Sequence, residues 1–81
     1  MDKFAIDEGS ILESKSNGWK RIVTDISVNE LGITEIWSSE FWFDKKGKVK
    51  LDYETCADSE LENIYIHYNL VGEDSKFFKK D

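Results

Sequence analysis

One thiol and one imidazole are the side chains best suited to catalysis, because Cys56 and His67 each occur once in the 81-residue chain. A thiolate becomes a nucleophile when a neighbouring base takes its proton and a third group orients that base. The sequence offers no evident orienting residue for this pair, and it contains no glycine-rich phosphate loop. We therefore expect no catalytic activity.

Carboxylates are the other candidates for chemistry. A metal site built from Asp52, Glu54, Asp58 and His67 would need at least three ligands to converge from a loop and a strand. The spacings that zinc and calcium sites use are not present. We expect no metal ion and no cofactor.

The charge of the chain favours protein binding. Seventeen acidic against eleven basic residues give a net charge of −6, whereas a phosphate backbone rewards Lys and Arg. We therefore expect a basic protein partner and no direct contact with nucleic acid. A run of acids without Lys or Arg is either solvated surface or one side of such an interface. The run comprises Asp52, Glu54, Asp58, Glu60 and Glu62.

Three turn signals divide the chain into segments of alternating apolar and polar residues. The signals are Asn17-Gly18, the Asn-Glu-Leu-Gly run at 29–32 and the Asp-Lys-Lys-Gly run at 44–47. The alternation between them predicts strands over about 19–28, 33–43 and 48–54. We predict a β-dominated α+β fold: a single small antiparallel meander sheet of four to five strands with at most one short helix. It forms one domain over residues 1–81.

The strand register follows from the turns, because hairpin partners keep a constant sum of residue numbers. A three-residue loop with a left-handed Gly47 aligns the strands on both sides of it. The resulting pairs are Phe43–Val49, Phe41–Leu51 and Ser39–Tyr53. If Val28 faces Ile33 across the preceding turn, Thr24 faces Trp37. Both alignments gather one apolar set on one face, which we expect to be buried. Its members are Trp37, Phe41, Phe43, Val49, Leu51 and Tyr53.

The same register gives the reverse face a tryptophan pair beside a charged row. Trp19 would lie opposite Trp42, and Arg21 opposite Glu40. Glu40 in turn faces Asp52, a repulsive pair unless Arg21 compensates. With the acidic run, this face supplies the candidate partner-binding residues Trp19, Arg21, Glu40, Trp42, Asp52, Glu54, Asp58, Glu60 and Glu62. In the alternative, a second small core covers the tryptophans, built from Phe4, Ile6, Ile11 and Leu12 or from Phe77-Phe78.

Two segments carry conflicting signals. Residues 62–71 alternate like a strand, but Ser59 and Glu62 have the spacing of a helical capping box. We favour the strand because the segment is rich in β-branched and aromatic residues. Ser10 and Glu13 repeat the capping pattern, so a short helix over 10–16 competes there with a hairpin arm.

Residues 36–72 combine a Trp-led strand, a Gly-Lys turn, a strand ending in Asp-Tyr-Glu, an acidic Ser-containing loop and an aromatic segment ending at Leu-x-Gly. In this chain these features are Trp37, Gly47-Lys48, Asp52-Tyr53-Glu54, Asp58-Ser59-Glu60 and residues 65–72. With them, this part of the chain resembles the C-terminal part of the YezG-type bacterial immunity proteins, antitoxins that neutralise cognate polymorphic toxins. The resemblance implies an α+β fold and an inhibitor without catalysis.

We therefore expect a small acidic immunity protein that blocks a basic toxin such as a nuclease. Residues 1–10 lack the basic start and apolar run of a signal peptide, and no apolar stretch approaches the roughly 18 residues of a membrane span. With a single cysteine, this indicates a cytoplasmic protein without membrane contact. One alternative is a phage-encoded acidic inhibitor of a host defence nuclease, acting like an anti-CRISPR protein or a nucleic-acid mimic. Another is an assembly subunit whose tryptophan face forms a homodimer or larger homo-oligomer.

Overall fold

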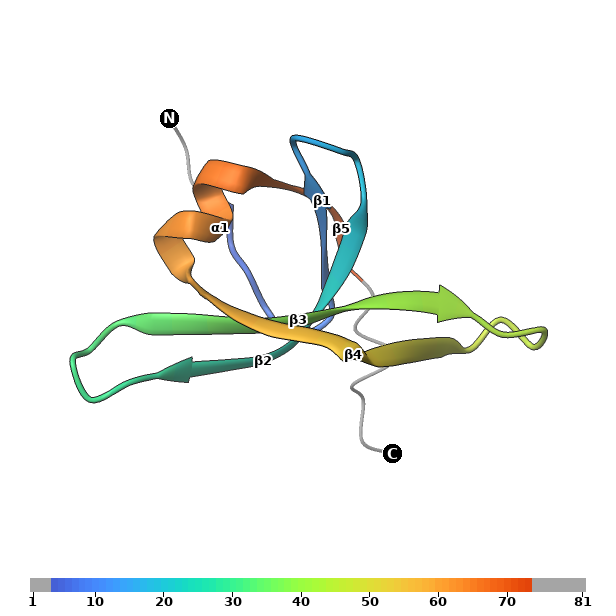
Figure 1. Ribbon diagram of the computed structural model, residues 1–81, viewed down its shortest axis with the longest axis horizontal. Helices are drawn as coiled ribbons and strands as arrows, with labels where there is room; N and C mark the ends of the chain where they lie inside the picture. Colours follow the sequence, from blue (N-terminus) through green and yellow to red (C-terminus); the bar gives the residue numbers. More distant parts are fainter. Residues whose placement is uncertain (1–3, 74–81) are drawn as a thin grey trace.

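The computed structural model describes residues 4–73 as five strands and one helix (Figure 1). In chain order the elements are β1 (Ser10–Ser14), β2 (Lys20–Val28), β3 (Thr34–Phe43), β4 (Val49–Glu60), α1 (Leu61–His67) and β5 (Tyr68–Glu73). The strands form one antiparallel sheet in the order β4-β3-β2-β1-β5. The predicted β-dominated α+β fold and its meander are confirmed, and β5 adds a return strand beside β1.

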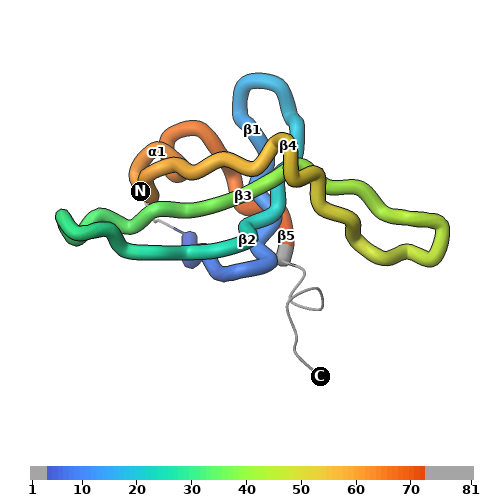
Figure 2. Tube along the Cα trace, turned by 60° about the horizontal axis from the view of Figure 1, so that its bottom comes forward, coloured from blue at the N-terminus to red at the C-terminus, as the bar shows by residue number. Residues whose placement is uncertain are grey.

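The turn between β3 and β4 is a three-residue loop, as predicted. The Asp44 carboxylate accepts the backbone N–H groups of Lys46 and Lys48 at 2.8 and 2.9 Å. Gly47 completes the loop at a φ of 79°, a conformation that residues with a Cβ rarely adopt. The pairs Phe43–Val49 and Phe41–Leu51 follow from it and are confirmed. This end of the hairpin projects beyond the rest of the sheet in both views (Figures 1 and 2).

The turn between β2 and β3 repeats this design with Asn29 in place of the aspartate. The side-chain oxygen of Asn29 accepts the Ile33 N–H at 3.1 Å, and Gly32 has a φ of 79°. Asn29 therefore faces Ile33, and Val28 pairs with Thr34. The predicted Val28–Ile33 pair is wrong by one residue, because this loop also contains three residues rather than four.

Both central ladders change register near the middle of the sheet. Between β2 and β3 the shift falls between Val23 and Asp25, so Asp25 rather than Thr24 faces Trp37. Beyond the shift, Val23 faces Ser38, which is the alignment that the predicted Thr24–Trp37 pair implies. The shorter turn shifts the pairing of β2 with β3 by one residue from the predicted register. A one-residue bulge in β2 then restores the predicted register.

The second irregularity lies between β3 and β4. Glu40 pairs with Asp52 as predicted, but the next recorded pair is Ser38 with Ala57. Residues 53–56 of β4 therefore stand opposite Ser39 alone, and the predicted Ser39–Tyr53 pair does not form. We call residues 53–56 the β4 bulge.

The hydrophobic core lies on the face of the sheet that α1 covers. Its buried members are Leu12, Val23, Ile36 and Ile64, each at most 1% exposed. The partly buried residues packed against them are Phe4, Ile6, Ile26, Leu61, Tyr68 and Leu70. Residues of the N-terminal segment, β1, α1 and β5 therefore share one core with β2 and β3.

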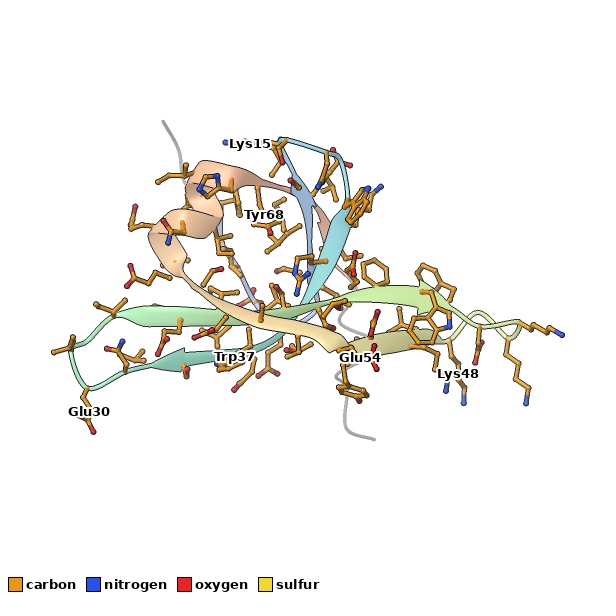
Figure 3. All side chains as sticks on the ribbon, in the orientation of Figure 1. Lys15, Glu30, Trp37, Lys48, Glu54 and Tyr68 are labelled. Carbon is orange, nitrogen blue, oxygen red and sulfur yellow. The ribbon has the colours of Figure 1, made fainter. Side chains whose placement is uncertain are left out.

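The face that the sequence analysis expected to be buried is the opposite one, and that prediction is wrong. Trp37 is 37% exposed, Phe43 55% and Tyr53 79%. Neighbouring side chains of a strand leave on opposite faces, so the burial of Ile36 turns Trp37 away from α1 (Figure 3). Three members of the expected set, Phe41, Val49 and Leu51, are half-buried.

Residues 61–73 divide between the two structures that the sequence suggested. Leu61–His67 is helical, so the strand prediction is wrong there, while Tyr68–Glu73 is a strand. The helix begins after Glu60, which makes no side-chain capping hydrogen bond, so the capping box does not form. The Tyr65 hydroxyl donates to the Phe4 carbonyl at 2.7 Å, which ties α1 to the segment before β1.

The other ambiguous segment is a hairpin arm. Residues 10–14 form β1, and the chain returns to β2 through a turn in which the Gly18 N–H donates to the Ser14 carbonyl at 2.9 Å. The competing helix over 10–16 is not present. In residues 4–73, no helix has the length and apolar character needed to cross a membrane.

Helix α1 yields a matched test of the core. Replacing Ile64, which is 1% exposed, by Ala should lower the free energy of unfolding by about 2–5 kcal/mol through the cavity it leaves. Ile66→Ala is the control on the same helix at a side chain 60% exposed, and should change stability by at most about 0.5 kcal/mol. Urea denaturation measures both. In a strand, residues 64 and 66 would share one face. Equal losses of unfolding free energy in the two variants would therefore contradict the helix.

The Asp44 turn predicts a pH effect confined to the hairpin end. The backbone hydrogen bond from Lys48 is the main reason that the pKa of Asp44 lies below its ordinary value of 3.8. A lowered folded pKa means that the carboxylate stabilises the turn fully above pH 3.8 and loses this effect as pH falls through the lower value.

Amide chemical shifts measure this titration directly. The N–H signals of Lys46 and Lys48 should titrate with a midpoint below pH 3.8. The N–H groups of Leu31 and Ile33 are the internal control, because their acceptor is the uncharged Asn29 side chain. Asp44→Asn should remove the titration and keep the turn. A midpoint at or above 3.8 would contradict the prediction.

Candidate partner-binding surface

One guanidinium group joins three strands at the centre of the candidate surface. Arg21 on β2 donates from Nε to the Ser38 hydroxyl at 2.9 Å and from Nη2 to the Ser38 carbonyl at 2.7 Å. The same Nη2 donates to the Thr55 carbonyl in the β4 bulge. The planar fork of donors suits arginine to bridging several acceptors at once. Arg21 therefore fixes the bulge of β4 against β2 across β3.

The Thr55 side chain satisfies backbone groups that the β4 bulge takes out of the ladder. Its hydroxyl accepts the Glu40 N–H at 2.8 Å and donates to the Asp52 carbonyl at 2.8 Å. The Asp52 carboxylate accepts the Glu54 N–H at 3.2 Å. Unpaired backbone groups are costly when they are shielded from water, so these bonds allow the ladder to break here.

Glu40 and Asp52 face each other across β3 and β4, as predicted, and both are half-buried. Like charges in this position repel each other. The predicted compensation by Arg21 does not take the form of an ion pair: within residues 4–73 the recorded pair is Lys20 with Glu13, at 3.5 Å. Arg21 is bonded to carbonyl and hydroxyl oxygens instead. Within residues 4–73, neither carboxylate therefore forms an ion pair with a basic side chain.

A pocket of about 150 Å³ adjoins Arg21 and Glu40. Residues from four strands and from the turn between β1 and β2 meet there. The lining residues are Ser14, Asn17, Trp19, Arg21, Glu40 and Tyr68. Tyr68, at the start of β5, lies between α1 and β1 (Figure 3). A cavity of roughly this volume holds one benzene molecule, so the pocket has room for one side chain.

The two candidate tryptophans are exposed but do not pair. The ladder between β2 and β3 ends at Ile22 with Ser39, after which β2 pairs with β1 alone. Trp19 is 66% exposed and Trp42 is 53% exposed, and Trp42 faces Lys50 on β4. The predicted Trp19–Trp42 pair is therefore wrong.

The alternative cover for these tryptophans is also wrong where the structure tests it. Phe4, Ile6 and Leu12 pack in the core with Val23 and Ile36 rather than over the tryptophans. The other proposed cover, residues 77–78, lies outside the described part of the chain.

The acidic run lies along one edge of the sheet. β4 is the terminal strand in the sheet order and carries four of the acids, and the fifth is in the first turn of α1. We call this set the acidic edge: Asp52, Glu54, Asp58, Glu60 and Glu62. All except the half-buried Asp52 are exposed. The lysines of the hairpin turn, of which Figure 3 labels Lys48, are separated from Glu54 along the hairpin.

The residues considered for catalysis lie on different elements. Cys56 is an exposed thiol in the β4 bulge, and His67 is the exposed last residue of α1. Across the described residues, no three His, Cys, Asp or Glu side chains are arranged to hold a metal ion.

The sequence analysis missed several residues of this surface. Thr55 and Ser38 carry the bonds to Arg21, and Ser14, Asn17 and Tyr68 line the pocket. Only Asn17 had a local signal, as part of a predicted turn. Tyr68 reaches the pocket because β5 returns beside β1, a long-range pairing that no local pattern indicates.

Comparison of the chain with protein-family models, curated proteins and solved structures finds no match. The resemblance of residues 36–72 to YezG-type proteins stays a prediction.

The role of Arg21 predicts a specific loss of stability. Arg21→Lys keeps the charge but cannot bridge Ser38 and Thr55 with a planar fork, so the free energy of unfolding should fall by about 1–3 kcal/mol. The Glu40 N–H, bonded to Thr55, should exchange faster with solvent.

The control for this variant is the opposite substitution, lysine to arginine, at the neighbouring residue Lys20. Lys20 is exposed, with 52% of its side chain accessible, so Lys20→Arg should change stability by at most about 0.5 kcal/mol. Denaturant unfolding and hydrogen exchange measured by NMR report both effects. Wild-type stability in Arg21→Lys, with slow exchange at Glu40, would show that the guanidinium does not hold the bulge.

Proposed function

We propose that this protein binds and neutralises a basic protein, as an immunity protein does with its cognate toxin. The observation that supports this proposal is the position of the acidic edge. Its acids are gathered on the terminal strand of the sheet and the adjoining helix turn, with four of five side chains exposed. They therefore place negative charge along one border of the sheet.

Electrostatics explains why such a border selects a basic partner. Clustered charge of one sign raises the association rate of an oppositely charged protein, and it repels proteins of like charge. Acidic side chains on a terminal strand also oppose pairing of this edge with the same edge of another copy. A toxin that acts on nucleic acid is a fitting partner, because a phosphate-binding surface is rich in Lys and Arg.

Exposed tryptophans beside the acids supply the other part of a binding surface. Trp19 shares the pocket with Glu40, and Trp42 lies two residues from Glu40 on β3. Large aromatic side chains are frequent energetic anchors of protein interfaces. The surface thus combines negative charge for approach with apolar area for contact.

The proposed setting is the bacterial cytoplasm. The exposed Cys56 thiol is compatible with a reducing compartment, where cysteines stay unpaired. The resemblance of residues 36–72 to YezG-type immunity proteins suggests a toxin as the partner. A phage-encoded inhibitor of a host nuclease would use the same surface on a different target.

A homo-oligomeric assembly subunit is the second candidate, and exposed aromatic residues favour it. Trp37, Phe43 and Tyr53 lie on the face opposite the core, with exposed fractions of 37–79%. Aromatic area of this kind is typical of surfaces that bind another protein chain. Sedimentation analysis separates this candidate from the first, because an immunity protein needs no self-association.

Charge reversal on the acidic edge tests the proposed function. The double variant Asp58→Lys, Glu60→Lys should slow association with the partner by roughly tenfold or more at low salt, and raising the salt concentration should reduce the difference. The partner is captured from the native host, identified by mass spectrometry and then purified. Surface-binding kinetics at two salt concentrations give the rates.

The control variant changes the net charge equally at another place. Glu8→Lys with Glu30→Lys reverses two exposed acids outside the acidic edge, and should slow association much less. Equal effects of the two double variants would show that only the net charge matters. A captured partner that is not basic, or association independent of salt, would overturn the proposed function.

A further inference from the structure

The pocket beside Arg21 contains a carboxylate without a bonded partner. Glu40 donates its backbone N–H to Thr55, but its side chain makes no recorded hydrogen bond or ion pair with residues 4–73. The group is half-buried and faces a second half-buried carboxylate, Asp52. A charge that is partly removed from water favours a nearby opposite charge.

The guanidinium group of Arg21 does not form an ion pair with the Glu40 carboxylate. Arg21 directs Nε and Nη2 to Ser38 and Thr55, so these donors are committed to holding the strands. With one cation and two anions, the group formed by Arg21, Glu40 and Asp52 has a net charge of −1. One additional cation would neutralise it.

We propose that the pocket receives one cationic side chain, a lysine or an arginine, from the basic partner. The inference rests on the proposed function and names the chemistry of the contact. The side chain enters past Trp19 and places its charge against Glu40, with Asp52 adding attraction from the next strand. The volume of about 150 Å³ has room for one such side chain.

The remaining lining suits the charged head of that side chain. The lining surface is mainly polar, and Trp19 is one of its residues; a tryptophan face attracts a cation within about 6 Å. Ser14 and Asn17 add side-chain oxygen atoms to the lining, although the Asn17 oxygen already accepts the backbone N–H of Trp19 at 2.9 Å. The lining thus supplies both charge and shape for one long basic side chain.

The experiment uses small probes and the whole protein. The probes are the N-acetyl methylamides of lysine, arginine, norleucine and glutamate, titrated into labelled protein and followed by NMR. The lysine or arginine probe should shift the Trp19 indole N–H and the backbone N–H groups of Asn17 and Glu40, with an affinity in the millimolar range. Norleucine, which lacks the charge, and glutamate, which reverses it, should bind at least tenfold more weakly. Equal shifts with norleucine, or no shift at the pocket, would overturn the proposal.

A pair of variants assigns the effect to the pocket. Glu40→Gln keeps the size and removes the charge, so it should weaken probe binding by tenfold or more. It also relieves the repulsion with Asp52, so thermal unfolding should show no loss of stability. Glu54→Gln, an exposed acid of the same edge outside the pocket lining, is the matched control and should bind like wild type. Equal weakening by both variants would mean that the cation is only attracted to the edge as a whole.

The two proposals fail in different measurements. Probe binding requires no partner, so it tests the pocket even if charge reversal on the acidic edge leaves partner association unchanged. Conversely, suppose that the double variant Asp58→Lys, Glu60→Lys associates more slowly with the partner as expected while no probe binds the pocket. That combination would overturn the pocket proposal and keep the proposed function.

Discussion

The bond network of Arg21 is the constraint on which the rest of the surface depends. The two central ladders change register beside Ser38, one toward β2 and the other toward β4. Arg21 binds both polar groups of Ser38 and continues to Thr55, so a single side chain spans both irregularities. Without it, the carbonyl of Thr55 would lose its donor and the β4 bulge its anchor. The positions of Glu40 and Asp52 follow from the same network, because the Thr55 hydroxyl binds the backbone of each.

Alternation of apolar and polar residues along a strand does not determine which face of the sheet is buried. A period of two along a strand indicates which residues share a face. That part of the prediction was correct for Phe41 and Phe43, whose rings meet edge to face with their centroids 5.8 Å apart. The period does not indicate which face receives a cover when both are apolar. Here the cover is α1, which inserts Ile64 beside Ile36 and is tied to Phe4 through Tyr65. The pattern at 62–71 favoured a strand, so the cover itself was missing from the sequence-based picture.

Local signals were reliable where one side chain and one glycine determine the structure. The Asp44 turn was predicted with its register, and the Asn29 turn has the same spacing between its side-chain acceptor and its glycine. Reading the two turns as one type would have given the correct alignment near Val28. The β4 bulge had no such signal, because its main anchor comes from Arg21, 34 residues away in the chain. The charged residues of the candidate surface stand out in the sequence, whereas Tyr68 reaches the pocket only through the long-range pairing of β5 with β1.

The acidic edge and the pocket act over different distances, and this separates their proposed roles. Exposed charges are felt over about a Debye length, roughly 8–10 Å at moderate salt, so the edge influences a partner before contact. Glu40 and Asp52 are half-buried and gain a cation only when a side chain enters. Under the two proposals, the edge would govern the rate of association, and the pocket would govern how long the complex lasts. Under the pocket proposal, the entering cation would also offset the repulsion between Glu40 and Asp52, so partner binding would raise the stability of the sheet.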